Sequence, residues 1–148
     1  MGEAAQVYEI PVEFRRTVPI LRVFDVAKAK EFYLDFLGFQ VDWEHRFEPE
    51  LPLYKQISRG DLVIHLSEHH GDGPPGTAVF VDMTGLRKFH HEITAKRYPN
   101  LRPGIERMPW NADVMAVTDP FGNNIRFTEY LVDGTSGRPN QSKVRSRS

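Results

Sequence analysis

The sequence predicts a single α+β domain made of two βαβββ modules, whose mixed sheets form a curved, cup-like cleft with the helices on its convex side. The hydrophobic spacing changes between the two-residue period of strands and the roughly 3.6-residue period of helices. The order is strand, helix and about three strands, and it occurs twice. Each half is too short to bury much core by itself, so the two halves should pack together within one 148-residue domain.

The first module covers about residues 17–67. A β-branched apolar run at 18–24 predicts a largely buried strand. A helix should follow, with Asp25 as its N-cap and Gly38 as its stop. The next segment alternates strictly, which predicts a half-buried strand with one face formed by Phe39, Val41, Trp43, His45 and Phe47. Segments 51–59 and 61–67 then predict a hairpin that turns at Arg59-Gly60-Asp61.

The second module covers about residues 76–131. A strand at 77–83 precedes a helix that Thr84 can cap and that should end near Tyr98. After a broken segment with a possible short strand around Ile105, two strands at 112–119 and 124–131 flank the turn "PFGN". Asp119 and Asn123 are expected to serve this turn through side chain to backbone hydrogen bonds.

Both ends of the chain lie outside these modules. In the N-terminal arm, residues 1–16, apolar residues alternate at Tyr8, Ile10, Val12 and Phe14. Pro11 restricts their pairing to an edge or an end of a strand. The arm therefore predicts an extra edge strand that either reaches a second subunit or covers the chain's own sheet. Residues 132–148 are polar and rich in Gly, Ser and Arg, which predicts a flexible tail.

Composition excludes several functional classes. The net charge of -1 gives no general attraction to nucleic acid or to an anionic membrane. No apolar run approaches the roughly 20 residues that span a bilayer. The chain has no cysteine, so it forms no disulfide, thiolate zinc site or cysteine nucleophile. The start "MGEAAQVYEI" is not a secretory signal. A cytoplasmic protein with neither a nucleic acid nor a membrane as partner is expected.

Two stretches carry a resemblance to a known family: "VPILRVFDVAKAKEFYLDFLGF" (18–39) and "PWNADVMAVTDPFGNNIRFTE" (109–129). Together with "LVIHLSE" and "GTAVFVD" they resemble the vicinal oxygen chelate superfamily, which includes glyoxalase I, extradiol dioxygenases and bleomycin resistance proteins. The Pro109-Trp110 pair is most similar to the bleomycin resistance branch. That branch usually has Gly after the Trp, and Asn111 can adopt the positive φ that Gly would supply. The resemblance implies a homodimer with grooves at the subunit interface.

The resemblance also bears on metal binding. Metal enzymes of the superfamily place their ligands at four positions that match Val18, His65, Thr77 and Arg126 here. A divalent ion needs three or more N or O donors, and only His65 is a good one. His69 lies past the strand end, so "HLSEH" is not the helical pair of a zinc enzyme. The resemblance therefore implies no metal or other cofactor, with His65 as the sole candidate if a metal does bind.

A ligand-binding site is expected on the inner faces of the sheets. Large flat rings stack on planar ligands, and a strand arginine needs a carboxylate or an anionic ligand group as partner. His65 either bonds a neighbour, contacts ligand, or titrates near neutral pH. Core packing is the alternative for Trp43. The acidic stretch 43–52 suits a cationic ligand. The expected ligand contacts are Trp110, Trp43, Phe47, Tyr54, His65, Met115 and Arg126.

These features favour a metal-independent binding protein for bleomycin-type antibiotics, which protects by sequestration and catalyses nothing. Two alternatives remain open. One is a metal-dependent lyase or dioxygenase of the same superfamily. The other is a binder of an unrelated small ligand, because a shared fold does not determine the ligand.

Overall fold

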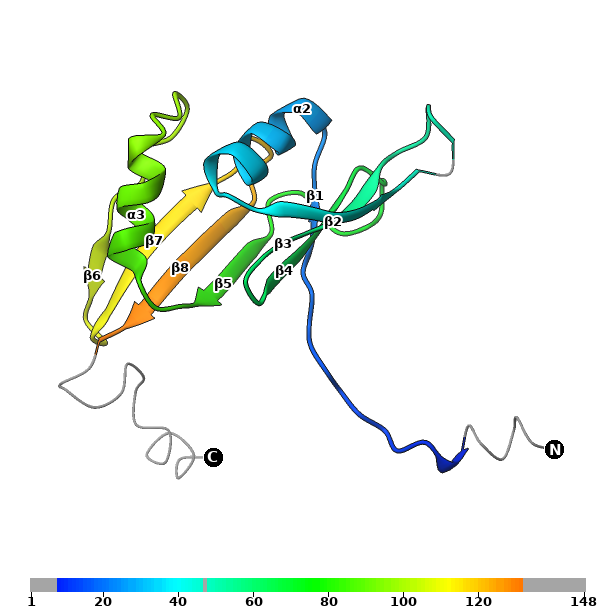
Figure 1. The fold of residues 1–148 in the computed structure, drawn as a ribbon, viewed down its shortest axis with the longest axis horizontal. Coiled ribbons are helices and arrows are strands. Elements are labelled where there is room, and N and C mark those ends of the chain that lie inside the picture. Colours follow the sequence, from blue (N-terminus) through cyan, green and yellow to red (C-terminus); the bar gives the residue numbers. More distant parts are fainter. Residues whose placement is uncertain (1–7, 47, 132–148) are drawn as a thin grey trace.

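The computed structural model describes residues 8–46 and 48–131, and it has two four-stranded mixed sheets (Figure 1). Sheet A has the order β1-β4-β3-β2, with β1 (Ile20–Arg22), β2 (Gln40–His45), β3 (Tyr54–Arg59) and β4 (Leu62–Ser67). Sheet B has the order β5-β8-β7-β6, with β5 (Ala78–Asp82), β6 (Glu106–Met108), β7 (Ala112–Thr118) and β8 (Asn124–Tyr130). In each sheet the first strand runs parallel to its neighbour and the other pairs are antiparallel. The predicted repeat of two βαβββ modules is confirmed.

The first helix forms as predicted, whereas the second is capped differently. The first consists of α2 (Val26–Ala29) continued by the π-helical η1 (Lys30–Phe36). The Asp25 carboxylate accepts a hydrogen bond from the Lys28 amide at 3.0 Å, and Gly38 has a φ of +80°. The second helix, α3 (Leu86–Ala95), ends before Tyr98. No helix in the described part of the chain is long and apolar enough to cross a membrane.

The expected cap of α3 by Thr84 is wrong. Gly85 occupies the cap position with a φ of +78°. The Glu129 carboxylate of β8 accepts hydrogen bonds from the amides of Gly85 and Leu86 at 3.1 and 3.0 Å. A side chain 43 residues away thus does what a local hydroxyl was expected to do.

A single core joins the two modules, and it explains the two faces of each sheet. Its fully buried members come from both sheets and both helices: Leu21, Phe32, Tyr33, Ile57, Ile64, Leu86, Ile93, Met115 and Ile125. Alternate residues of each strand face this core, so the intervening residues lie on the opposite face. We call that opposite face the open face of sheet A or of sheet B. Among the described residues no strand ladder joins the two sheets.

The Asp119–Asn123 turn ties the modules together. Tyr33 Oη on η1 donates to Asp119 Oδ2 at 2.6 Å, and Asn123 Nδ2 donates to the same oxygen at 2.9 Å. Asn123 Nδ2 also donates to the Arg22 carbonyl of β1 at 2.8 Å, while Asn123 Oδ1 accepts from the Thr77 amide at 3.1 Å. Burial, and secondarily the Asp119 charge, raise the pKa of Tyr33, so it remains a neutral donor. The expected turn bonds are confirmed, since Asp119 Oδ1 accepts from the amides of Phe121 and Asn123.

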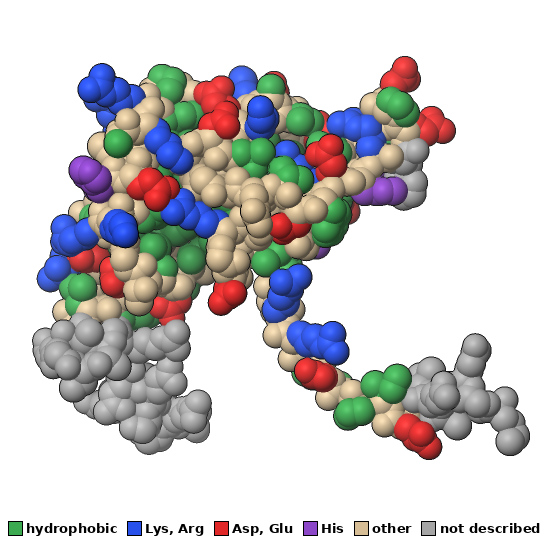
Figure 2. Space-filling view, viewed as in Figure 1, with side chains coloured by type: hydrophobic (Ala, Val, Ile, Leu, Met, Phe, Trp, Pro, Cys, Tyr) green, Lys and Arg blue, Asp and Glu red, His purple; other side chains and the backbone are tan. Residues whose placement is uncertain are grey.

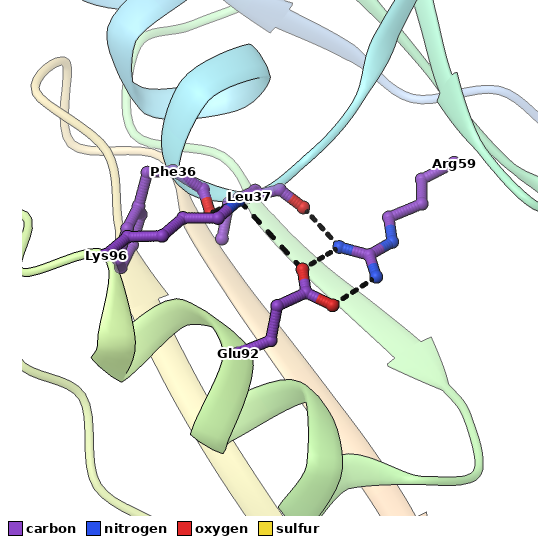
Figure 3. A network of polar contacts seen from close by, with 5 residues as sticks. All are labelled: Phe36, Leu37, Arg59, Glu92 and Lys96. Atoms are coloured by element: carbon purple, nitrogen blue, oxygen red, sulfur yellow. Dashed lines mark hydrogen bonds and ion pairs between the residues drawn. The ribbon is translucent and has the colours of Figure 1, made fainter.

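A second tie crosses the modules at their other side (Figure 3). Arg59 of β3 donates from Nη1 and Nη2 to both carboxylate oxygens of Glu92 on α3, at 2.7 and 2.9 Å, and from Nη1 to the Leu37 carbonyl at 2.8 Å. Lys96 Nζ donates to the Phe36 carbonyl at 3.0 Å. A Cβ at Gly38 would lie 2.6 Å from Arg59 Nη1, so a larger residue would displace this guanidinium, and the φ of +80° also favours glycine here.

The described part of the N-terminal arm, residues 8–16, stands away from the body of the molecule (Figures 1 and 2). Residues 11–19 form neither helix nor strand, so the arm does not cover an edge of its own sheets. The apolar residues Tyr8, Ile10, Val12 and Phe14 are exposed, Phe14 at 96%. Coverage of the chain's own sheet edge, one of the two expected roles, is therefore not seen for the described part of the arm. Residues 1–7, Phe47 and the expected flexible tail at 132–148 lie outside the described residues.

Replacing Asn123 with Ala should destabilise the protein by about 3 kcal/mol, since it leaves the buried Arg22 carbonyl and Thr77 amide without partners. Differential scanning calorimetry should show a melting temperature lowered by about 10 °C. The exposed Asn100 provides the matched control, and Asn100→Ala should change stability by less than about 0.5 kcal/mol. Equal, small effects of both substitutions would show that the turn is not the tie described here.

Candidate functional site

A β-bulge in β2 determines which residues form the site. Val41 pairs with Ile57, but Trp43 pairs with Gln56, so Asp42 is the extra residue. The prediction that Val41 and Trp43 share a face is therefore wrong. Val41 shares the core side with Ile57, whereas Trp43 lies on the open face of sheet A. Sequence alternation cannot reveal such an insertion, because one added residue reverses the facing of every residue after it.

Aromatic rings gather on the open face of sheet A. The strand registers place Ile20, His65, Gln56 and Trp43 in one cross-strand row and Arg22, Ser67, Tyr54 and His45 in the next. The Trp43 and Tyr54 rings are stacked, with centroids 6.0 Å apart and planes inclined by 12°. Both rings meet His65 edge to face, at 5.3 and 5.2 Å. A hollow of about 350 Å³ lies against Trp43, His45, Tyr54, His69 and Asp72.

A chain of hydrogen bonds fixes the orientation of these rings. Tyr54 Oη lies 2.7 Å from His65 Nδ1, and His65 Nε2 lies 3.0 Å from Gln56 Oε1. Gln56 Nε2 donates to Asp42 Oδ2 at 3.0 Å, so the amide presents its oxygen to His65. We therefore assign the proton to Nε2, which leaves Nδ1 to accept from Tyr54. The Ser58 hydroxyl donates to the other Asp42 oxygen at 2.9 Å and ends the chain.

The electrostatics keep this chain in one protonation state. Burial, and secondarily the positive charge of Arg16, lower the pKa of His65, so the imidazole is neutral at pH 7. Burial and then the Asp72 charge raise the pKa of Tyr54, so its hydroxyl keeps its proton. Hydrogen bonds from Gln56 and then Ser58 lower the pKa of Asp42. The site therefore presents neutral aromatic rings, and the hydrogen-bonded chain that orients them leads to the anionic Asp42 carboxylate.

The open face of sheet B carries a second group of exposed side chains. Phe80 of β5 is 57% exposed and Trp110, in the turn before β7, is 58% exposed. The exposed Arg126 of β8 pairs across the sheet with Phe80 and Ala116, and its Nε donates to Asn124 Oδ1 at 3.1 Å. Asn111 has a φ of +62°, as expected for the residue that replaces Gly after this Trp. The structure thus separates Trp110 and Arg126 from the aromatic rings of sheet A.

Of the two other expected ligand contacts, one faces the core and one lies outside the described residues. Met115 is fully buried on the core face of β7, so its side chain cannot contact a ligand on the open face of sheet B. Its neighbour Ala116 has the open facing instead. Phe47 lies outside the described residues. The sequence analysis did not include Gln56 and Ser58 in the site, although both alternate with Tyr54 along β3 and so share its face. Asp42 could not be assigned to the site from the sequence, because its position depends on the β-bulge in β2.

A further hollow lies away from the aromatic rings of sheet A. It has a volume of about 610 Å³ between the modules, and its walls include Phe39, Leu62, Met83 and Phe89. Its charged lining includes the Arg59–Glu92 ion pair together with Asp61, Asp82 and Lys88. We interpret this hollow as the seam between the modules, because residues of both modules line it and the Arg59–Glu92 pair crosses it.

The residues at the superfamily's metal positions do not fit a metal ion. On β1 the neighbour of His65 is Ile20, two residues after Val18, and neither has a donor atom in its side chain. The Thr77 hydroxyl donates to the Pro74 carbonyl at 3.2 Å, and Arg126 adds a positive charge. Within residues 8–46 and 48–131, no three His, Cys, Asp or Glu side chains are grouped so that they could hold a metal.

The chain belongs to the glyoxalase superfamily, since the family model described as "Glyoxalase superfamily protein" matches residues 3–135. The bleomycin-binding protein of bleomycin-producing Streptomyces verticillus, solved with copper(II)-bleomycin, is 27% identical; the match covers 79% of this chain and 97% of that one, with a TM-score of 0.58. A bleomycin-binding protein complexed with bleomycin is 20% identical, with 80% and 100% covered and a TM-score of 0.60. The bleomycin resistance determinant of transposon Tn5 is 19% identical, with 78% and 97% covered and a TM-score of 0.60. The last two, at 20% and 19% identity, show only that the fold is shared.

His65 should titrate below its unperturbed pKa of about 6.5 and carry its neutral proton on Nε2. Because the unfolded chain binds this proton more readily, His65 favours folding above pH 6.5 and that contribution is lost as the pH falls below it. Long-range ¹H–¹⁵N NMR checks both the tautomer and the midpoint. Tyr54→Phe removes the donor to Nδ1 and should raise the midpoint, whereas the same spectra should show His91 unchanged. A His65 midpoint above 6.5 in the unaltered protein would contradict this assignment.

Proposed function

We propose that this protein binds a planar small molecule of the bleomycin type on the open face of sheet A and sequesters it without a metal ion. The observation that carries the proposal is the stacked Trp43–Tyr54 pair, which His65 and Gln56 hold in place on a face that the chain's own helices leave uncovered. The similarity to the Streptomyces verticillus protein solved with copper(II)-bleomycin supports the choice of ligand. The expected cytoplasmic location is part of the same proposal.

Binding would follow from the shape and polarity of this face. Planar ligand rings stack on Trp43, which is 43% exposed, and lose contact with water. The hydrogen-bonded chain from Tyr54 to Asp42 already has its partners, so the rings need no reorganisation when a ligand arrives. Asp72 borders the same hollow and can attract a cationic substituent. No covalent step is involved.

We also propose a homodimer in which the groove is completed by the partner subunit. Each chain exposes aromatic side chains on two open faces, Trp43 on sheet A and Phe80 on sheet B, and Trp110 is exposed in the turn before β7. An extended arm with exposed Tyr8, Ile10, Val12 and Phe14 has no place on its own chain. Exchange of the arms would bury these apolar side chains and bring one subunit's sheet A against the partner's sheet B.

A binder of an unrelated small ligand is the second candidate, and one observation favours it. Arg126 brings a positive charge to the open face of sheet B, where a cationic drug would not gain from it. The metal-dependent lyase or dioxygenase is not supported, because Val18, Ile20, Thr77 and Arg126 supply no adequate set of donors.

Metal-free bleomycin, titrated into EDTA-treated protein, should bind at about one molecule per chain with a submicromolar dissociation constant. Isothermal calorimetry and the fluorescence of Trp43 and Trp110 provide two independent signals. Trp43→Ala should weaken binding by about tenfold or more, since a stacked ring is typically worth at least 1.4 kcal/mol. Val41→Ala, on the same strand but the opposite face, is the control and should bind normally. A flat titration by both signals would reject the bleomycin assignment, and metal that survives dialysis at one ion per chain would reject the metal-free mechanism.

The full-length chain should be a dimer at micromolar concentration, and deletion of residues 1–16 should make it a monomer. The physical reason is that the arm offers four exposed apolar side chains that only another chain can cover. Multi-angle light scattering measures the mass directly. A variant with Glu13→Gln tests the arm's charge alone and should stay dimeric. A monomeric full-length protein, or a dimer that survives the deletion unchanged, would exclude the arm-exchanged assembly.

A further inference from the structure

Arg22 is a buried arginine on the open face of sheet A. Arg22 is only 6% exposed. Its neighbour Leu21 lies in the core, so the Arg22 side chain is on the opposite face of β1. The registers place it in the same cross-strand row as Ser67 and Tyr54. Two strand spacings, about 10 Å, therefore separate Arg22 from the Tyr54 ring that stacks on Trp43. The site proposed for ring stacking thus continues across β4 to a guanidinium group.

The Arg22 guanidinium has no anionic partner within the described residues. Its Nε is buried and makes no hydrogen bond, and no described carboxylate forms an ion pair with it. It packs on the Phe24 ring, 5.1 Å from the ring centroid. Arg59, by contrast, has both a carboxylate and a carbonyl as partners. A buried charge without a partner is costly, so a group from outside these residues is expected to complete it.

Asp72, in the loop after β4, is bound to this row through Ser67 and forms no ion pair with Arg22. Ser67, which lies between Arg22 and Tyr54, donates its hydroxyl to Asp72 Oδ2 at 2.6 Å and accepts from the His69 amide at 3.0 Å. The segment that carries Asp72 lies close over β1, since a Cβ on Gly73 would be 3.8 Å from the Ile20 carbonyl oxygen. An anion beside Arg22 would thus be shielded from bulk water, where a charge-assisted hydrogen bond is strong.

We propose that Arg22 is an anion-binding subsite of the open-face site, and that the ligand is a planar aromatic molecule bearing an oxyanion such as a carboxylate or sulfonate. The ring lies on Trp43 and Tyr54, and the oxyanion accepts hydrogen bonds from the guanidinium fork, whose geometry matches two oxygens. Asp72 borders the hollow beside Trp43 and Tyr54, so a ligand that also carries a cationic group would meet an acid there. This inference rests on the proposed function only for the place of the ring.

Two fluorescent probes with the same rings test it: 8-anilinonaphthalene-1-sulfonate, which has a sulfonate, and N-phenyl-1-naphthylamine, which has none. The unaltered dimer should bind the sulfonate at least about tenfold more tightly. Arg22→Gln should weaken sulfonate binding by about ten- to a hundredfold, as expected for a lost hydrogen bond to a charged group, and change binding of the neutral probe less than about twofold. Arg102→Gln changes the net charge equally at an exposed position and should affect neither probe.

Three results would overturn the proposal. One is equal sulfonate affinity in the Arg22→Gln and unaltered proteins. Another is an equal loss of both probes in a variant with an unchanged circular dichroism spectrum, which would make Arg22 a structural residue. The third is failure of both probes to bind the unaltered protein, which would also remove the ring site of the proposed function. If the neutral probe and bleomycin bind, but the sulfonate probe binds no more tightly than the neutral one, the anion subsite is rejected and the ring site of the proposed function stands.

A competition on the unaltered protein keeps the test independent of folding. Benzoate should displace the sulfonate probe, whereas benzamide, which has the same ring and no charge, should do so at least about tenfold less well. Equal displacement by the two would sink the proposal even if Arg22→Gln cannot be produced. Thermal unfolding adds a further check, because removing an unpaired buried charge should leave the melting temperature unchanged or raise it, whereas a structural arginine would lower it.

Discussion

The carboxylate of Asp119 and the amide of Asn123 form the junction on which the arrangement of the two modules depends. Through them a turn of the second module holds η1 by Tyr33, β1 by the Arg22 carbonyl and the start of β5 by the Thr77 amide. All of these groups except Thr77 are buried, so each bond avoids the cost of an unsatisfied polar group. The junction brings the edges of both sheets to one place and leaves their open faces uncovered.

The open face of sheet A combines one residue at a superfamily metal position with a group of aromatic rings. His65 is one of the four superfamily positions, yet its ring nitrogens are occupied by Tyr54 and Gln56, and its strand neighbour Ile20 offers no donor atom. The same strands that would converge on a metal instead align Trp43, Tyr54 and His65 as a fixed aromatic surface. An unpaired Arg22 at the end of this surface then gives it a charged terminus, which would select among planar ligands.

Most elements could be predicted because their signals are local. Asp25 and Gly38 bound the first helix, and alternation located most of the strands, since capping and facing depend on residues a few positions apart. The wrong predictions concern positions whose capping or facing depends on residues far away in the sequence. Glu129 replaced Thr84 as the cap of α3, and Met115, expected at the ligand, faces the core because β7 packs its odd-numbered residues inward.

The sequence by itself determined the order of the elements, the absence of thiolate chemistry and the poor donors at the metal positions, because these follow from residue types and short-range spacing. Only the tertiary structure decided which side chains share the site. The bulge at Asp42 turned Trp43 onto the open face, and the register of three strands placed Tyr54, His65 and Gln56 beside it. That no carboxylate within residues 8–46 and 48–131 pairs with Arg22 is likewise a property of the packed chain. Strand register and ion pairing join residues far apart in sequence, and no local pattern of side chains encodes those distances.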